Sequence, residues 1–237
     1  MTGKRAALVT GARGGIGAAI VARLEADGWA VHGVDIDDGD LTTREGNRRV
    51  VEAAIARFGR LDAVVPNAGF QHVAPLNDFP EEQWDKLIAL LLTSPFLLAR
   101  YAWDALAAAG DSRICVIASA HALTASPFKA GYVSAKHGVL GLVKVLALEG
   151  AELGISTTAV CPAYVRTPLV EAQISEHMRT SGLDEDEVLE GVLLERQAVK
   201  RMLEPYEVAD LVSFLLGPAG RGITGVPVPI DLGWTAR

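Results

Sequence analysis

The sequence has little cysteine, no excess of positive charge and no long uninterrupted apolar segment, and each shortage argues against a class of protein. Only Cys115 and Cys161 occur among the 237 residues, which excludes a disulfide framework and makes a reducing cytoplasm the expected location. Both stand in apolar segments, where burial is a better explanation than catalysis. Lys and Arg total 22 against 29 Asp and Glu, giving a net charge of -7 with no basic cluster. Nucleic-acid binding is therefore not expected.

No segment of the sequence indicates export or membrane insertion. The chain starts MTGKRAALVTG and runs directly into a strand-like segment, without the apolar region of a signal peptide. The richest apolar stretch, Leu87 to Leu98, is interrupted by Thr93, Ser94 and Pro95. We therefore expect no membrane-spanning segment and no membrane partner.

Half of the chain is apolar and 22% is charged, and no repeat or linker divides it, so residues 1–237 are expected to form one domain. Short β-branched runs alternate with helical periods, which is typical of an α/β fold with a doubly wound parallel sheet of the Rossmann type. The expected strands cover residues 6–10, 31–35, 63–66, 114–118, 156–160 and 226–230. The expected helices cover residues 16–27, 44–58, 81–108, 133–149 and 205–216, with one or two surface helices within 171–201.

Two details constrain this sheet. Too few residues separate Asp35 from the helix expected at Arg44 for a further parallel strand with its own helix, so this unit is shortened. Pro227 and Pro229 lack N–H groups on the same side of the last strand, which predicts that this strand is an edge.

The first chemical motif joins the first strand to the first helix and reads Thr10-Gly11-Ala12-Arg13-Gly14-Gly15-Ile16-Gly17. Glycines there let the backbone approach a pyrophosphate, which also meets N–H donors at the helix N-terminus. Asp35, at the end of the second strand, can accept hydrogen bonds from both ribose hydroxyls of adenosine and would repel a 2′-phosphate. The sequence therefore favours NAD over NADP, although Arg13 is a possible phosphate partner.

The second motif is Tyr132 and Lys136, one helical turn apart and hence on one face. A nearby ammonium and a nicotinamide cation would lower the phenol pKa, letting Tyr132 exchange a proton with a substrate oxygen. Ser119 ends the preceding strand, where its hydroxyl can hold the same oxygen. A Tyr-x-x-x-Lys spacing alone is usually a surface pair, but the glycine motif and Ser119 together favour catalysis.

The chain resembles the short-chain dehydrogenases/reductases over essentially its whole length. The resemblance rests on the two motifs and Ser119, together with Asn67-Ala68-Gly69, Pro162 and Thr167-Pro168. The resemblance implies hydride transfer with a nicotinamide cofactor, in which Ser119 orients the reacting group, Tyr132 is the acid/base and Lys136 also binds ribose. Residues 171–204 would be a substrate lid. The implied cofactor-binding residues are Thr10, Gly11, Arg13, Gly15, Ile16, Gly17, Asp35, Asp40, Leu41, Asn67, Ala68, Gly69, Tyr132, Lys136, Pro162, Val165 and Thr167; no metal ligand is implied.

A narrower resemblance is to the D-3-hydroxybutyrate dehydrogenases of that family. It rests on Phe70-Gln71-His72-Val73-Ala74-Pro75, residues 119–138, residues 166–174 and the terminal GWTAR. It implies a small carboxylate substrate bound by Gln71, Ser119, His121, Lys129, Tyr132, Tyr164 and Gln173, with Tyr164 where the group usually carries tryptophan. Independently, His121 and Lys129 lie between Ser119 and Tyr132, where they would offer cationic donors to a carboxylate. They could also be ordinary loop residues.

Three substitutions depart from the family pattern. Pro66 and Ala163 replace an asparagine and a glycine in the flanking motifs. Leu91 stands where many relatives place an asparagine that holds a proton-relay water, which leucine cannot do. We expect another water path to serve Lys136, the alternative being reduced activity.

The leading hypothesis is NAD-dependent oxidation of D-3-hydroxybutyrate to acetoacetate. The alternatives are the same chemistry on another small hydroxy acid or a 3-oxoacyl thioester, or an NAD-binding protein without turnover. The helices expected within residues 95–108 and 133–149 are apolar around much of their circumference, which indicates subunit contacts or deep burial. Since relatives are commonly tetramers, a homotetramer is expected.

Overall fold

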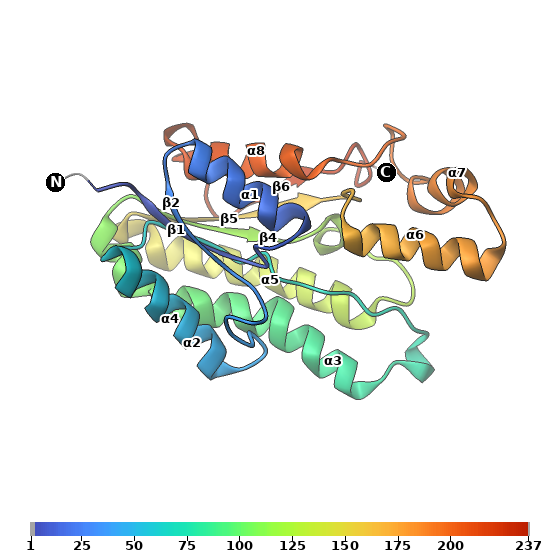
Figure 1. Ribbon diagram of the computed structural model, residues 1–237, viewed down its shortest axis with the longest axis horizontal. Helices are drawn as coiled ribbons and strands as arrows, with labels where there is room; N and C mark the ends of the chain where they lie inside the picture. Colours follow the sequence, from blue (N-terminus) through green and yellow to red (C-terminus); the bar gives the residue numbers. More distant parts are fainter. Residues whose placement is uncertain (1–2, 237) are drawn as a thin grey trace.

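The computed structural model of the protein describes residues 3–236 (Figure 1). Six strands form one parallel sheet in the order β2-β1-β3-β4-β5-β6. This confirms the predicted parallel α/β fold. The strands are β1 (Ala6–Thr10), β2 (Ala30–Val34), β3 (Ala63–Val65), β4 (Ser112–Ile117), β5 (Ile155–Pro162) and β6 (Pro227–Ile230).

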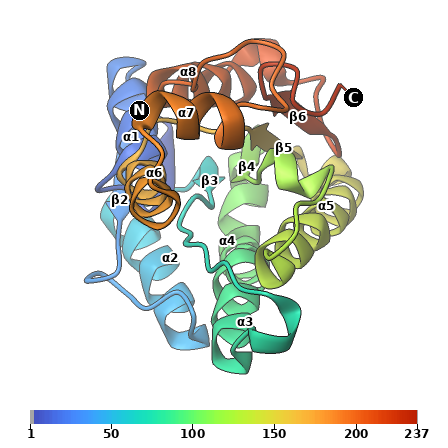
Figure 2. The ribbon, with the colours of Figure 1, turned by 90° about the vertical axis from the view of Figure 1, so that its right-hand side faces the viewer.

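Helices cover both faces of the sheet, as Figures 1 and 2 show together. On one face α1 (Gly15–Ala26) packs beside α8 (Pro205–Leu216). On the other face lie α2 (Arg44–Phe58), α4 (Ser94–Ala109) and α5 (Ala130–Gly150). The central strands are buried on both faces, because their β-branched side chains alternate between two apolar cores. Short 3-10 turns occur at Leu76–Asp78, Ala120–Ala122, Ala151–Leu153 and Pro218–Gly220.

The segment between β2 and α2 is shortened, as predicted. Residues 35–43 form turns and no strand, and α2 begins at Arg44. The hydroxyl of Thr43 accepts a hydrogen bond from the N–H of Gly46 and so caps this helix. β2 is consequently one edge of the sheet.

β6 is the other edge, which confirms the prediction from its two prolines. The carbonyl groups of Val226 and Ile230 accept hydrogen bonds from Ala159 and Ala163 and therefore face β5. Successive residues of a strand direct their backbone N–H and C=O groups to opposite sides, so the nitrogens of Pro227 and Pro229 face away from β5. The ladder to β5 loses no donor to proline.

The region expected as one long helix is α3 (Glu81–Ile88), a π-helical segment (Ala89–Thr93) and α4. Contrary to the expectation from the sequence, the stretch Glu81–Ala109 is long and apolar enough, by length and composition alone, to cross a membrane. Its leucines at 97, 98 and 106 are buried under the sheet, and 44% of its most apolar window lies inside the protein.

After β5 the chain forms α6 (Pro168–Ser181), α7 (Glu185–Val188) and a π-helical turn (Leu189–Leu193). In Figure 1 these elements extend beyond the end of the sheet at which the strands finish. They enclose a small core of their own, formed by Val170, Ile174, Val188, Leu193, Leu194 and Met202. The expected surface helices are thus present, and the first of them begins three residues before Glu171.

Candidate active site

Two adjoining cavities lie at the carboxyl ends of the strands, with volumes of about 150 Å³ and about 660 Å³. We call the smaller the substrate cavity and the larger the nucleotide cavity. Such a position is where ligands bind to open α/β sheets. The two cavities share the lining residues Ile16, Asn67, Gly69, Phe70, Thr167 and Leu169.

The glycine turn after β1 forms one wall of the nucleotide cavity. Gly11 has a φ of +64°, and a Cβ there would come within 2.9 Å of the Ala68 Cα. A Cβ on Gly17 would lie 1.9 Å from the carbonyl oxygen of Gly11, so α1 packs directly against the turn. Gly11, Gly14 and Gly15 line the cavity, so the turn presents backbone without side chains to a ligand, as a phosphate-binding turn requires.

Asp35 stands on the same cavity wall. Its Oδ2 accepts a hydrogen bond from the Arg13 N–H at 3.0 Å, and its Oδ1 accepts one from the Ile36 N–H at 2.9 Å. The guanidinium of Arg13 pairs with Asp37 and Asp38, its distance to Asp38 being 3.0 Å. Arg13 is therefore already neutralised by carboxylates and is poorly placed to bind a further phosphate.

Most of the predicted cofactor-binding residues line one of these cavities, including Asp40 and Leu41 from the shortened segment. Thr10 and Gly17 line neither. The Thr10 hydroxyl accepts hydrogen bonds from the N–H groups of Asn67 and Ala68, at 2.9 Å and 3.0 Å. These contacts fix the turn after β3 against the end of β1.

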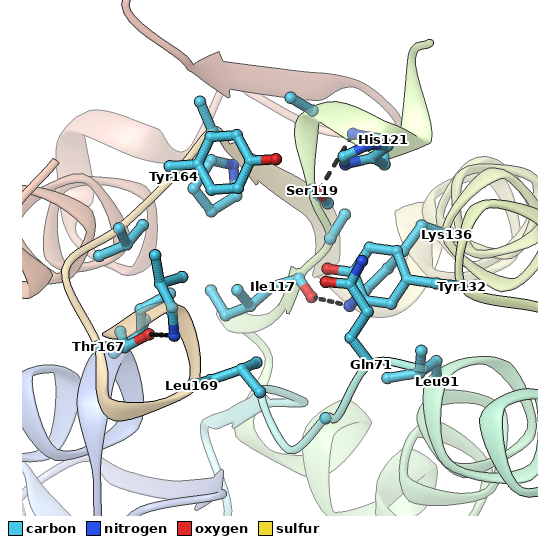
Figure 3. Close-up of a pocket in the computed structure, with 18 of the residues that line it drawn as sticks. Gln71, Leu91, Ile117, Ser119, His121, Tyr132, Lys136, Tyr164, Thr167 and Leu169 are labelled. Atoms are coloured by element: carbon cyan, nitrogen blue, oxygen red, sulfur yellow. Dashed lines mark hydrogen bonds between the residues drawn. The ribbon is translucent and has the colours of Figure 1, made fainter. Parts of the chain in front are cut away.

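Ser119, Tyr132 and Lys136 line the substrate cavity (Figure 3). Ser119 follows β4, while Tyr132 and Lys136 lie one turn apart on α5. The Nζ of Lys136 donates a hydrogen bond to the Ile117 carbonyl at 2.8 Å and lies 5.7 Å from the centroid of the Tyr132 ring. The structure thus brings the three predicted catalytic side chains together.

Burial controls the pKa values of these groups. It lowers the pKa of Lys136 to about 8, and it raises the pKa of the Tyr132 phenol although a hydrogen bond with Ser119 acts in the opposite direction. The expected lowering of the Tyr132 pKa is thus not produced by the chain itself. A further positive charge beside the phenol is needed to activate it.

The predicted carboxylate-binding residues Gln71, His121, Lys129, Tyr164 and Gln173 line the same cavity. The Gln173 amide donates a hydrogen bond to Gln71 Oε1 at 3.3 Å, joining α6 to the loop after β3. The Lys129 ammonium lies 5.8 Å from the Tyr164 ring centroid, and burial lowers its pKa. In Figure 3 the Tyr164 hydroxyl points into the cavity.

His121 is neutral at pH 7, which corrects the expectation of a second cation. Burial, together with the positive charges of Lys129 and Arg196, lowers its pKa to about 3. Its Nε2 lies 3.0 Å from the Ser126 hydroxyl. Lys129 is therefore the cation of this set, and His121 contributes a neutral hydrogen-bonding ring.

Trp234 also lines the substrate cavity and was not among the predicted site residues. The centroid of its ring lies 4.9 Å from the centroid of the His121 ring, and Trp234 is only 5% exposed. The Asp231 carboxylate accepts hydrogen bonds from the N–H groups of Gly233 and Thr235, forming the turn that carries Trp234. The terminal GWTAR, which supports the narrower resemblance, contains this residue, but no spacing in the sequence indicates that it lies near Ser119.

Leu91 lies in the π-helical segment and also lines the substrate cavity. It is 2% exposed and packs in a small apolar cluster with Leu87, Ala135 and Tyr132. A Cβ on Gly69 would meet a Leu91 methyl at 3.0 Å. An apolar side chain therefore lies beside Tyr132, at the position where the family resemblance implies an asparagine.

Cys115 and Cys161 are both buried and free, as predicted. Burial raises the pKa of Cys115 to about 12, so this thiol is unreactive at neutral pH. Among the side chains that the structure describes, no three His, Cys, Asp or Glu are grouped as a metal site requires.

Residues 38–235 match a family model described as Enoyl-(Acyl carrier protein) reductase. The chain is 48% identical over 181 residues to a D-beta-hydroxybutyrate dehydrogenase of Rhizobium meliloti, covering 76% of this chain and 70% of the relative. It is 36% identical over 258 residues to the D-beta-hydroxybutyrate dehydrogenase of Cupriavidus necator, covering both chains completely. The chain belongs to the short-chain dehydrogenase/reductase family.

Other comparisons show how wide this family is. An acetoacetyl-CoA reductase of Rhizobium meliloti is 31% identical, with 97% of this chain and 98% of the relative covered. A solved structure of a short chain dehydrogenase family protein from Francisella tularensis superimposes with a TM-score of 0.90 at 26% identity, covering 99% of this chain and all of the other. The protein is therefore an oxidoreductase of this family, with a fold shared along its whole length.

Two departures from the family motifs leave the framework of this short-chain dehydrogenase intact. The carbonyl oxygen of Pro66 accepts a hydrogen bond from the Ile117 N–H at 2.9 Å, so the proline still joins β3 to β4. The N–H of Ala163 donates to the Ile230 carbonyl at 3.1 Å, which aligns the end of β5 with β6. Neither substitution moves the backbone pairing that supports the site.

Proposed function

We propose that the protein catalyses the reversible, NAD-dependent oxidation of D-3-hydroxybutyrate to acetoacetate. One observation carries the proposal: a proton-transfer set of Ser119, Tyr132 and Lys136 shares a small cavity with the cation Lys129 and the neutral ring of His121. A short 3-hydroxy acid has a carboxylate and a reacting hydroxyl only a few bonds apart. Both groups find partners in this cavity.

The nucleotide cavity suits a dinucleotide without a 2′-phosphate. The Asp35 carboxylate has lone pairs left to accept ribose hydroxyls after its two backbone contacts. A phosphate would meet Asp35, Asp37 and Asp38 together, and Arg13 is already paired with two of them. This charge distribution supports NAD over NADP. When bound, NAD supplies the hydride acceptor for the oxidation.

In the proposed reaction, Lys129 binds the substrate carboxylate and so places the hydroxyl-bearing carbon beside Ser119 and Tyr132. The Ser119 hydroxyl orients the substrate oxygen, and the Tyr132 phenolate accepts the hydroxyl proton. Lys136, cationic at neutral pH because its pKa is about 8, provides one positive charge near the phenol ring, and bound NAD would provide the further charge that the buried phenol needs to form a phenolate. Trp234 and Leu91 exclude water from the apolar side of the cavity.

The main alternative is the same chemistry on another small hydroxy acid or on a 3-oxoacyl thioester, which the name of the acetoacetyl-CoA reductase relative keeps open. Lys129 discriminates between these substrates, because a free carboxylate needs a cation and a neutral thioester does not. Lys129→Met should raise KM for 3-hydroxybutyrate by about tenfold or more and change turnover of a neutral ketone little. An NAD-binding protein without turnover is the third possibility.

The experiment follows NADH absorbance after D-3-hydroxybutyrate and NAD are mixed with the purified protein. We expect fast reduction of NAD with the D enantiomer and little with the L enantiomer or with NADP. The Tyr132→Phe variant should lose turnover and keep NADH binding. Binding of NADH without reduction on any hydroxy acid would reject the proposed reaction in favour of a binder.

A cytoplasmic homotetramer and a lid at residues 171–204 complete the proposal. Leu148 on α5 is 80% exposed, and Phe96 on α4 and Val145 on α5 are also exposed, which supports contacts between subunits through these helices. The small separate core of α6 and α7 supports movement of this segment as a unit. Light scattering would test the assembly.

A further inference from the structure

The shortened segment between β2 and α2 is anchored by a single fully buried polar side chain, Asn47. We infer that Asn47 is the positioning residue for the adenine end of the nucleotide cavity. The inference rests on the proposed binding of NAD there. It assigns a role to a residue that does not line the cavity.

The segment itself forms a wall of the nucleotide cavity, since Gly39, Asp40, Leu41 and Thr42 all line it. It directly follows Asp35, the proposed partner of the adenosine ribose, so the adenine of bound NAD would lie against this wall, which we call the adenine wall. Residues 35–43 have no strand partner, because β2 ends the sheet on this side. A wall without backbone pairing needs side-chain contacts to keep one conformation.

Asn47 supplies such contacts from the first turns of α2. Its amide Nδ2 donates hydrogen bonds to the carbonyl oxygens of Leu41, at 2.8 Å, and of Thr43, at 2.7 Å. Its Oδ1 accepts a hydrogen bond from the Ser94 hydroxyl at 2.6 Å. Asn47 is completely buried, so both of its amide N–H bonds and its oxygen are used within the protein.

The neighbouring glycine brings the segment close enough for these bonds. A Cβ on Gly46 would lie 2.0 Å from the carbonyl oxygen of Asp40, so the segment passes directly over the helix backbone. Local bonds shape the turn: the Asp40 carboxylate accepts from the N–H and hydroxyl of Thr42. Arg49 adds an exposed contact to the Asp38 carbonyl. The buried bonds are those of Asn47, which water does not replace readily.

Ser94 connects the segment to the wall between the two cavities. It begins α4, directly after the π-helical segment in which Leu90 lines the nucleotide cavity and Leu91 the substrate cavity. Asn47 therefore joins the adenine wall to the helix that carries these two leucines. Loss of Asn47 should loosen the adenine wall while Ser119, Tyr132 and Lys136 stay in place.

The test compares Asn47→Ala and Ser94→Ala with the unsubstituted protein by calorimetric titration of NAD, ADP-ribose and nicotinamide mononucleotide. ADP-ribose contains the adenosine half of NAD, and nicotinamide mononucleotide lacks it. We expect Asn47→Ala to weaken NAD and ADP-ribose binding by about tenfold and leave the mononucleotide unchanged. With saturating NAD, kcat should stay within about twofold. Ser94→Ala keeps both donors to the segment and should show a smaller effect in the same direction.

The matched control is Leu106→Ala, which should lower stability through a buried residue of α4 that lies about three helical turns beyond Ser94. Equal weakening of ADP-ribose binding by this control at equal loss of stability would overturn the positioning role. So would unchanged ADP-ribose binding in Asn47→Ala. If the unsubstituted protein bound neither NAD nor ADP-ribose, the proposed cofactor itself would be rejected, and this inference with it.

Discussion

Lys136 donates a hydrogen bond from its buried ammonium group to the main-chain carbonyl oxygen of Ile117, 2.8 Å away. The bond holds a cation at the end of β4, in a place where burial lowers its pKa to about 8. Below that pH the protein keeps a buried charge that its surroundings disfavour. A charge of this kind is expected where function, rather than stability, has selected it.

The first prediction concerns the stability that this charge costs. The folded-state pKa of Lys136 lies below its ordinary value of 10.5, so the folded protein binds fewer protons than the unfolded chain between about pH 8 and 10.5. The destabilisation is full below pH 8 and disappears as the pH rises above 10.5. Lys136→Met should therefore raise Tm at pH 7 by several degrees, about 2–4 °C for each kcal/mol removed, and lower kcat at least about 100-fold. Calorimetry at pH 7 and pH 10 should show the gain shrinking; a lower Tm at pH 7 would contradict it.

The second prediction concerns the choice of dinucleotide. Asp37→Asn with Asp38→Asn should release the Arg13 guanidinium from its carboxylates, and Asp35→Ala should remove the charge that opposes a 2′-phosphate. The triple variant should lower the ratio of kcat/KM for NAD over NADP by about tenfold or more. Steady-state kinetics with both dinucleotides measures the ratio. Replacing Arg13 by Ala in the triple variant is the control, since it should restore part of the preference.

The third prediction concerns pH and His121. Since burial, with Lys129 and Arg196, lowers its pKa to about 3, His121 stays neutral from pH 5 to pH 8. KM for a 3-hydroxy acid should therefore show no inflection near pH 6.5, where an ordinary histidine loses its proton and a cationic partner would be lost. Initial rates across this range test the point. An inflection that is present in the unsubstituted protein and absent in His121→Gln would show that substrate binding protonates His121.

The fourth prediction concerns Leu91, which packs beside Tyr132 and Ala135. Leu91→Asn places a polar amide in a cavity wall that is now apolar and should lower stability by about 1–3 kcal/mol. If Lys136 already has a sufficient water path, kcat should not rise. A rise of about tenfold or more would show instead that leucine limits turnover. Leu91→Met is the control, because it changes shape and not polarity.

The sequence was informative wherever spacing alone decides the geometry. Tyr132 and Lys136 share a helix face because four residues make one turn, and Pro227 and Pro229 marked an edge because N–H groups alternate along a strand. The short distance from Asp35 to Arg44 excluded another strand by length alone.

Features that depend on contacts between distant segments could not be predicted in this way. The pKa of His121 follows from burial in a cavity that Trp234 helps to enclose, more than a hundred residues later in the chain. Asn47 reads as an ordinary polar residue of a helix until Leu41 and Ser94 are placed around it. Arg13 could be taken for a phosphate ligand until Asp37 and Asp38 were seen to pair with it.

The outward-facing prolines of β6 have a consequence for how copies of the chain meet. An edge strand with free N–H groups invites another strand to join it, which leads to sheet extension and aggregation. Pro227 and Pro229 remove two donors from the exposed side while the bonds to β5 remain. At these two positions a neighbouring strand would find carbonyl acceptors but no N–H donors, so a regular ladder cannot form and extension of the sheet at this edge is disfavoured.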